Sequence, residues 1–518
     1  MVRLILLSLF AGFLYAAGFP LLGTKYYFFP GPILGFYIFG KLLKDNTCLK
    51  KQILAWTFFS QGFYILGFNW IPYTLYEFGN VEEPFNQVIG FFSFIVLLPP
   101  VIIFILALHL SKKYLPKDIN NYLKDPISLS IIATLFLENI PVQFPAFPGH
   151  SWLFFTPYLG LGTIFGASIF NFFSLFISIQ LVLKKIDTQL LKNIGYQAFF
   201  FIGINLAISF IQNQQPQIQE KINIRIVQAN IGNDSKTASE NGDLKSIYQI
   251  FSTYYDLSLK KSLKQIDLII WPETAFPYNI NTKLLKRSIY NIPHLIEEIL
   301  RKSKSNLFLG VRDAPSEKKL YNSGMFLDKD FNFDIYYKNK LLPFGEDLPL
   351  GPLTQIVKPY FPSIAFFDKG DKTTIFKLKN NIHFSSMICY EVLFPKLIYN
   401  QIRDVKKVPH FFVNITNDSW YGNTSEPEQH LFLSRWRAIE FGIPLVRSTN
   451  TGISTIINPK GDYKSRIEYN VEGVLDQDIY INKNSGTLFS ITGNYLFNLI
   501  SLLIIILRFL FRTRKALF

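Results

Sequence analysis

Cysteine and histidine are scarce in this sequence, which contains two Cys and six His in 518 residues. Two cysteines cannot form a disulfide framework, and no cluster of Cys and His has the spacing of a zinc site. The G-x-x-x-x-G-K-[ST] loop that cradles nucleotide phosphates is absent as well. We therefore expect a protein that needs neither a metal nor another cofactor.

Charged residues are also few, at 17% of the chain compared with about 25% in ordinary soluble domains. Apolar residues are concentrated in 1–212 and 487–511, and apolar runs of about 20 residues predict membrane-spanning helices. We expect eight such spans, near 3–22, 26–43, 52–75, 87–110, 126–140, 157–183, 194–212 and 488–511. The chain is thus predicted to contain a multi-span α-helical membrane domain with seven helices (1–212), a soluble domain (213–486), and a C-terminal transmembrane helix with a basic tail (487–518).

Acidic residues are outnumbered, with 37 Asp and Glu against 52 Lys and Arg. Sixteen of the basic residues lie at the two termini and in every second loop between the predicted spans, whereas the other short loops carry only Lys25. Because basic loops stay on the cytoplasmic side of a membrane, both termini are predicted to be cytoplasmic and 213–486 to lie outside. This pattern also explains much of the net charge of +15, so we expect no nucleic acid partner.

The two cysteines are then predicted to lie on opposite sides of the membrane, Cys48 inside and Cys389 outside, so that they cannot pair. A free thiol in an oxidising compartment is a liability unless it is buried or used. Cys389 is therefore either a small core residue or a nucleophile, and its position in the fold has to decide between the two.

The soluble domain alternates short β-type runs with helical stretches. Strands are expected at 222–230, 267–273, 306–313, 381–391, 410–418 and 443–452, and helices at 242–265, 283–303 and 428–441. Alternation of this kind is typical of an α/β domain whose helices cover a central sheet.

Three reactive residues stand at the ends of predicted strands in this domain. Glu273 ends DLIIWPE, Lys338 follows FDIYY, and Cys389 follows IHFSSMI. A carboxylate, an amine and a thiol could form a catalytic group. By spacing alone, however, Cys389 is as well explained as core filler, Glu273 as a surface residue, and Lys338 with Lys340 as solvated charges.

The segments around these residues, taken together and in order, carry a family resemblance. WPETAFP, YYKNKLLPFGE, ICYE, NDSWYG and RAIEFGIPLVRSTNTG resemble the carbon–nitrogen hydrolase (nitrilase) superfamily. The resemblance implies an α-β-β-α sandwich and a catalytic triad in which Glu273 is the general base, Lys338 stabilises the oxyanion and Cys389 is the nucleophile. Four further residues match supporting or substrate-binding positions of the family, namely Glu346, Tyr390, Glu391 and Trp420.

The PFGE sequence and the size of the membrane block are similar to a membrane-embedded, eight-span branch of this superfamily. That similarity implies a monomeric, multi-pass enzyme of the bacterial inner membrane. It would move an acyl chain from a phospholipid, phosphatidylethanolamine by resemblance, through a cysteine thioester to the N-terminal α-amino group of a diacylated apolipoprotein. Two rivals stay open: a membrane-tethered amidase or nitrilase, and a non-catalytic lipid-binding protein.

The sequence departs from the family pattern at two positions, with Thr237 where a Trp is frequent and Lys340 where a His is frequent. The apolar segment 348–367, interrupted by prolines and next to Glu346, is predicted to be a lid that contacts the membrane; a buried loop is the alternative reading.

Overall fold

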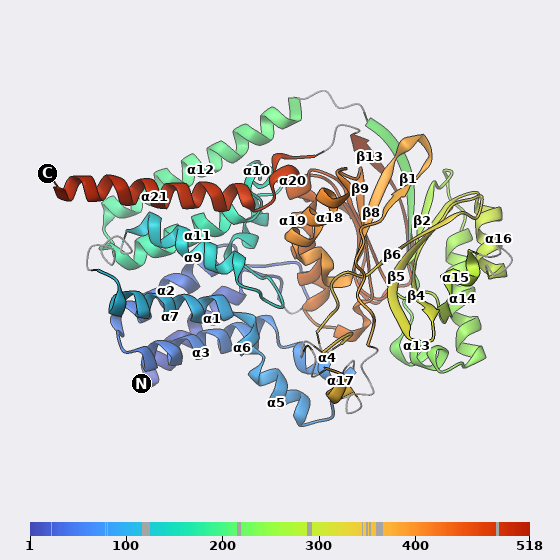
Figure 1. Cartoon of the computed structure of the whole chain (residues 1–518), viewed down its shortest axis with the longest axis horizontal. Helices are drawn as coiled ribbons and strands as arrows, with labels where there is room; N and C mark the ends of the chain where they lie inside the picture. Colours follow the sequence, from blue (N-terminus) through green and yellow to red (C-terminus); the bar gives the residue numbers. More distant parts are fainter. Residues whose placement is uncertain are drawn as a thin grey trace.

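The computed structural model describes the whole chain except residues 22, 78, 80, 117–124, 215–218, 287–292, 344, 349–350, 352–353, 359–365, 483–485 and 518. A bundle of roughly parallel helices occupies one half of the molecule, and a two-sheet domain occupies the other (Figure 1). Both chain termini lie at the end of the bundle that is remote from the sheets.

Helices from the first 214 residues and from the C-terminus build the bundle. They are α1 (Val2–Ala16), α2 (Gly31–Asp45), α3 (Leu49–Gly67), α4 (Ile71–Glu77), α5 (Phe85–Phe92), α6 (Phe94–Leu97), α7 (Pro99–Tyr114), α9 (Pro126–Asn139), α10 (Gly162–Phe165), α11 (Ser168–Leu183), α12 (Thr188–Gln214) and α21 (Tyr495–Leu517), with a 3₁₀ helix over Pro148–Phe155. Small residues bring α1 and α3 together: a Cβ on Gly12 would lie 2.1 Å from the Phe59 carbonyl oxygen. Such close backbone approach is typical of helix packing in membranes.

Each region predicted to span the membrane contains helix, but four of the eight are broken. The regions 52–75, 87–110 and 157–183 divide into α3–α4, α5–α7 and α10–α11, and the region 488–511 divides into α20 (Leu488–Thr492) and α21. Within the described residues, one helix, Thr188–Gln212, is by itself long and apolar enough to cross a membrane. Shorter apolar helices cover Val2–Ala16, Pro126–Asn139, Ser168–Leu183 and Tyr495–Phe511.

The physical reason for this difference is helix length. A helix of 15 residues rises about 22 Å, less than the hydrocarbon core of about 30 Å. The apolar runs continue beyond the helix ends into turns, so hydropathy extends further than helical structure. At Gly166, for example, a φ of +62° ends α10 inside the predicted span 157–183.

Two mixed sheets form the second half, and here the predicted sandwich is confirmed. The first has the order β13 (Gly473–Asn482), β1 (Gln219–Gln228), β2 (Leu268–Ile270), β4 (Asn306–Ser316), β5 (Lys319–Leu327) and β6 (Phe333–Tyr337), with β3 (Asn279–Ile280) paired to β4. The second has the order β12 (Tyr463–Ile467), β11 (Ser454–Ile457), β10 (Leu445–Thr449), β9 (Phe411–Thr416), β8 (His383–Ile388) and β7 (Ile375–Lys377). Aromatic rings close the space between the sheets, with Phe308 of β4 centred 5.1 Å from Phe376 and 5.4 Å from Phe384.

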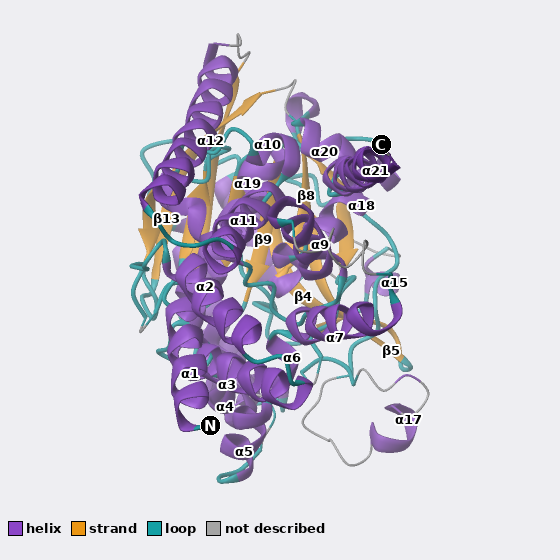
Figure 2. Ribbon diagram, turned by 90° about the vertical axis from the view of Figure 1, so that its left-hand side faces the viewer, coloured by secondary structure: helices purple, strands orange, loops and turns teal. Residues whose placement is uncertain are grey.

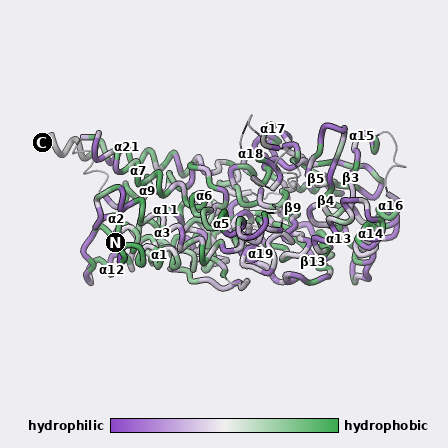
Figure 3. The backbone as a smooth tube through the Cα atoms, turned by 90° about the horizontal axis from the view of Figure 1, so that it is seen from below, coloured by the Kyte–Doolittle hydropathy of each residue, from purple (hydrophilic) through white to green (hydrophobic). Residues whose placement is uncertain are grey.

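Helices cover the outer face of each sheet. The first sheet carries α13 (Asn233–Glu240), α14 (Leu244–Leu259), α15 (Thr282–Leu285) and α16 (His294–Ser303), and the second carries α18 (Pro395–Val405), α19 (Glu426–Phe441) and α20 (Leu488–Thr492). Viewed from the bundle, the helices of the first half lie in front of the strands (Figure 2). Hydrophobic residues line α7, α9 and α21, whereas α13, α14 and α16 at the opposite end are largely hydrophilic (Figure 3).

Helix α19 joins the two halves. The Gln429 side chain donates to the Pro20 and Gly67 carbonyl oxygens at 2.9 and 2.8 Å, and the Ala167 backbone N–H donates to Glu440 Oε1 at 3.1 Å. Because buried polar groups need partners, these bonds fix how the second sheet sits on the bundle.

Candidate active site

The fold brings the three predicted triad residues together from both sheets. Glu273 lies three residues after β2, Lys338 directly follows β6, and Cys389 directly follows β8. All three side chains are buried. Since β2 is parallel to β1 and β4, and β8 is parallel to β9, carboxyl ends of parallel strands meet at one edge of each sheet.

Lys338 is held between two carboxylates. Its Nζ lies 3.2 Å from Glu273 Oε1 and 2.8 Å from Glu346 Oε2, and only 1% of its side chain is exposed. Burial opposes the charged amine, but the Glu273 and Glu346 carboxylates outweigh burial and hold the pKa of Lys338 well above its usual range. Lys338 is therefore a fixed cation, and Glu346, expected only as a supporting residue, contacts it directly.

Asn322 on β5 joins the same group, although nothing in its sequence surroundings marks it. Its Nδ2 donates at 2.7 Å to Glu273 Oε1 and at 2.7 Å to Glu346 Oε1. The backbone carbonyl oxygen of Asn322 accepts from the Lys338 backbone N–H at 2.9 Å. One amide thus sets the separation of the two carboxylates. The sequence could have indicated Asn322 only through the pairing of neighbouring strands, and using that pairing requires the register of β5 and β6 to be known.

The turn that carries Glu273 is strained and closely packed. Thr274, a β-branched residue, has a φ of +46°, a region that such residues rarely adopt. Gly310 on β4 makes room for this turn, since a Cβ there would lie 2.3 Å from the Pro272 oxygen and 2.6 Å from Glu273 Cα. From the other sheet, the Asn417 N–H donates to Glu273 Oε2 at 2.9 Å.

Cys389 begins a 3₁₀ turn (Cys389–Leu393) with a φ of +55°. Strain of this kind is often stored at functional sites. Burial raises the pKa of the Cys389 thiol well above its usual range; Glu273 raises it further, whereas Lys338 lowers it. The thiol is therefore neutral at rest, and a nearby base has to remove its proton during attack.

Glu391 ties the cysteine turn to the lysine loop. Its carboxylate accepts the backbone N–H groups of Ile388, Asn339 and Lys340 at 2.7 to 2.8 Å and the Tyr336 hydroxyl at 3.0 Å. Burial raises the pKa of Glu391 to about 7, although the Ile388 N–H and the Lys338 charge favour its ionised form. Glu391 therefore positions the loop rather than reaching a substrate.

The last two predicted residues, Tyr390 and Trp420, lie around the group formed by Glu273, Lys338 and Glu346. Lys338 Nζ lies 5.9 Å from the centre of the Tyr390 ring, and the Tyr390 hydroxyl donates to the Leu341 carbonyl oxygen. Trp420 is half-buried in a 3₁₀ turn (Asp418–Tyr421). With the Asn417 amide turned so that its oxygen faces donors, Trp420 Nε1 donates to that oxygen at 3.1 Å.

A buried lysine next to Thr237 was not anticipated. Lys236 Nζ donates to the Thr274 hydroxyl, within the turn that carries Glu273. Burial lowers the pKa of Lys236 to about 8, against the Glu240 and Glu273 charges that raise it. A second cation therefore lies near Glu273, on the side where the sequence departs from the family pattern.

One group of described residues has metal-ligand spacing, which the sequence did not indicate. Ligand atoms of Asp418, Glu426 and His430 lie within 4.8 Å of one another, and all three residues are buried. However, Arg447 Nη2 already lies 2.8 Å from Asp418 Oδ2, and a guanidinium there repels a second cation. Arg447 also donates to Asn414, which donates to the Cys389 carbonyl oxygen at 3.1 Å, so the group supports the cysteine turn.

The predicted lid falls largely outside the described residues, which lack 349–350, 352–353 and 359–365. Within it, α17 covers Thr354–Val357. At its end, the Phe367 N–H donates to the Glu346 carbonyl oxygen at 3.0 Å. This bond attaches the end of the segment to Glu346, which contacts Lys338.

Comparison with known proteins shows the family to which the chain belongs. Residues 223–483 match the carbon-nitrogen hydrolase family model, and the chain belongs to that family. Its similarity to curated relatives extends far beyond this domain. An apolipoprotein N-acyltransferase of Bdellovibrio bacteriovorus is 30% identical over 85% of this chain and 83% of the relative, and that of Haemophilus influenzae is 26% identical over 92% and 88%. The chain is a member of this acyltransferase branch of the family.

Solved structures align with half of the chain. Nit3 of Saccharomyces cerevisiae, a member of branch 10 of the nitrilase superfamily, gives a TM-score of 0.36 at 16% identity over 52% of this chain and 93% of that chain.

Proposed function

We propose that this protein N-acylates apolipoproteins, taking an acyl chain from a membrane phospholipid and passing it to the N-terminal α-amino group of a diacylated lipoprotein. Lipoprotein N-acylation agrees with the relatives over most of the chain. The observation that carries the mechanism is the buried Glu273–Lys338–Glu346 group beside the Cys389 thiol. It supplies a base, a fixed cation and a nucleophile in one place.

The first half-reaction forms a thioester. Glu273 takes the Cys389 proton as sulfur attacks the ester carbonyl of the phospholipid. The oxyanion that forms lies next to Lys338, whose ammonium has three donors, two of them directed at Glu273 and Glu346. The carbon–oxygen bond then breaks, and Glu273 returns its proton to the oxygen of the departing lysophospholipid.

The second half-reaction releases the chain to the acceptor. The lipoprotein amine attacks the thioester carbonyl, and Glu273 accepts a proton from the attacking nitrogen. The carbon–sulfur bond breaks, an amide forms, and Glu273 passes the proton to the departing sulfur, which regenerates the thiol. Because the group is buried, water has little access to the thioester, which favours transfer over hydrolysis.

The membrane placement of the chain belongs to the same proposal. We propose eight spans, a catalytic domain of residues 213–486 on the extracytoplasmic side of the inner membrane, and cytoplasmic termini. Both termini at the remote end of the bundle and the basic loops support it. Lifting a 16-carbon chain into water costs roughly 12 kcal/mol at about 0.8 per methylene, so an enzyme with two lipid substrates works best inside the bilayer.

The test uses the full chain in mixed micelles of phosphatidylethanolamine and a diacylated lipopeptide. We expect the peptide to gain one acyl chain that resists hydroxylamine, as an amide does. Release of free fatty acid without any triacylated peptide identifies a hydrolase instead and refutes the proposal. Replacing the donor by phosphatidylglycerol tests the headgroup, and sedimentation of the active protein tests whether it is a monomer.

A further inference from the structure

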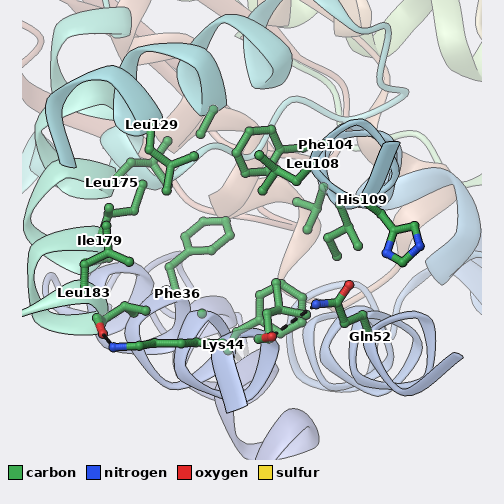
Figure 4. A pocket seen from close by; sticks show the side chains of 18 of the residues that line it. Phe36, Lys44, Gln52, Phe104, Leu108, His109, Leu129, Leu175, Ile179 and Leu183 are labelled. Atoms are coloured by element: carbon green, nitrogen blue, oxygen red, sulfur yellow. Dashed lines mark hydrogen bonds between the residues drawn. The ribbon is translucent and has the colours of Figure 1, made fainter. Parts of the chain in front are cut away.

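A cavity lies within the helical bundle, away from the active site. Helices α2, α7, α9 and α11 enclose about 390 Å³ (Figure 4), and none of the residues that line it belongs to the catalytic group. Its interior is apolar, with Phe36, Leu129, Leu175 and Ile179 among the side chains that face it. The cavity is large enough for a small-molecule ligand, but its interior offers few polar atoms.

The two lysines that line the cavity stand near the C-terminal ends of their helices. Lys44 stands one residue before the end of α2, and Lys112 two residues before the end of α7. Lys44 Nζ donates to the Val182 carbonyl oxygen near the end of α11 at 2.9 Å, and this bond uses one of the three donors of its ammonium. These helix ends lie at the remote end of the bundle, where both termini are found.

The length of the cavity suits a hydrocarbon chain. Its lining runs along α2 from Phe36 to Lys44 and along α11 from Leu175 to Leu183. Each stretch rises about 12 Å, which is close to the thickness of one leaflet of a hydrocarbon core of about 30 Å. An apolar channel of this length with two lysines at its mouth has the polarity of an acidic lipid: a chain inside and a phosphate at the rim.

We infer that this cavity binds one acyl chain of an anionic phospholipid from the cytoplasmic leaflet, with the phosphate between Lys44 and Lys112. The leaflet assignment rests on the proposed orientation; the site itself does not depend on the catalytic proposal. Basic pockets between helices on the cytoplasmic side bind anionic headgroups. Such a lipid bridges α2, α7 and α11 and stabilises the bundle, because a ligand that binds only the folded state raises its stability.

The test measures phosphatidylglycerol binding to the full chain in a neutral detergent, by native mass spectrometry and by the shift in melting temperature. Lys44→Ala and Lys112→Ala are each expected to weaken binding about fivefold, the factor that corresponds to about 1 kcal/mol per lysine near a surface. Ala133→Phe, which places a ring in the cavity, should abolish it. Lys41→Ala and Lys113→Ala, exposed lysines on the same helices that do not line the cavity, are the matched controls and should bind normally.

Lipopeptide acylation is measured in parallel on every variant and is expected to persist, so that failure of the lipid site is distinguishable from failure of the catalytic proposal. Equal losses in the cavity and control variants mean that general surface charge attracts the lipid, and overturn the inference. Wild-type protein without a bound phosphatidylglycerol also overturns it. If Ala133→Phe does not fold, the two lysine variants still decide.

Discussion

Lys338 shows how much depends on one buried side chain, because its ammonium contacts two carboxylates and interacts electrostatically with Cys389. A buried cation at this position has to be compact, with an unbranched side chain and a small charged group. A guanidinium has the same charge, but it spreads that charge over a wider plane with fixed donor directions. The space between Glu273 and Glu346 is set by Asn322 and does not suit that plane.

Lys338→Arg is therefore expected to lower thioester formation at least a hundredfold, a loss of about 2.7 kcal/mol or more in the transition state. Lys340→Arg is the matched control, since Lys340 is only partly buried and lies 4.3 Å from the centre of the Phe394 ring, where a guanidinium also stacks. The rate of thioester formation is measured for each variant with a labelled phospholipid as the donor. Similar damage at both positions means that the catalytic lysine is misassigned.

Lys236 leads to a prediction about pH. Its pKa in the folded protein is about 8, below the ordinary value of 10.5. Below pH 8 the amine is charged in both states and its burial destabilises the fold; between pH 8 and 10.5 the folded state loses the proton first, so stability rises with pH. Lys236→Met removes this dependence. The stability difference between wild type and variant should change by about 2–3 kcal/mol from pH 7 to pH 10.

Thermal unfolding at several pH values measures this difference, with the exposed Lys245→Met as the control. Parallel pH profiles of wild type and Lys236→Met contradict the assigned environment of Lys236.

The site residues divide by whether a local motif marks them. Glu273, Lys338 and Cys389 stand in short segments with a family resemblance, and the structure places them together. Asn322 and Lys236 carry no such mark. An asparagine within a strand is indistinguishable from a surface residue until strand register is known, and a lysine is expected in water until its burial is seen.

At the scale of elements, the position of a site residue depends less on the strand that precedes it than on the contacts that shape the turn after that strand. The turn Pro272–Thr274 fits against β4 only because Gly310 has no side chain. Gly310→Ala should therefore displace Glu273 and reduce thioester formation at least tenfold while the sandwich stays folded.

Gly473→Ala is the control for that prediction, since no atom lies within 4 Å of a Cβ at Gly473. Circular dichroism verifies the fold and a labelled donor measures the rate. Full activity of Gly310→Ala means that the turn adapts at little cost and that its packing does not set the position of the base.

Elements of the sandwich were more predictable than those of the bundle. The runs 222–230, 306–313 and 410–418 correspond to β1, β4 and β9, and the run 428–441 corresponds to α19. They could be predicted because the apolar periodicity of each run stops where turn residues begin. In the bundle, aromatic and apolar residues continue through turns near the sandwich. Hydropathy alone could not separate α3 from α4 or α10 from α11.

For the whole molecule, the proposed function requires one orientation in the membrane, and Cys48 tests it. Cys48 is exposed at the start of α3, whereas Cys389 is buried. A maleimide that cannot cross membranes should leave Cys48 unmodified in intact spheroplasts and modify it after the membrane is opened. Cys48→Ala is the control for labelling at other sites. Modification of Cys48 in intact spheroplasts would contradict the proposed topology.

The central claim is that an acyl chain is carried on Cys389, and the mass of the intact protein tests it most directly. After incubation with phospholipid alone, wild-type protein should gain the mass of one acyl chain. That chain should be removed by hydroxylamine, map to Cys389, and disappear when a diacylated lipopeptide is added. Cys389→Ala should gain nothing, because the group contains no other nucleophile of comparable strength. A chain on another residue, or normal transfer by Cys389→Ala, contradicts the account.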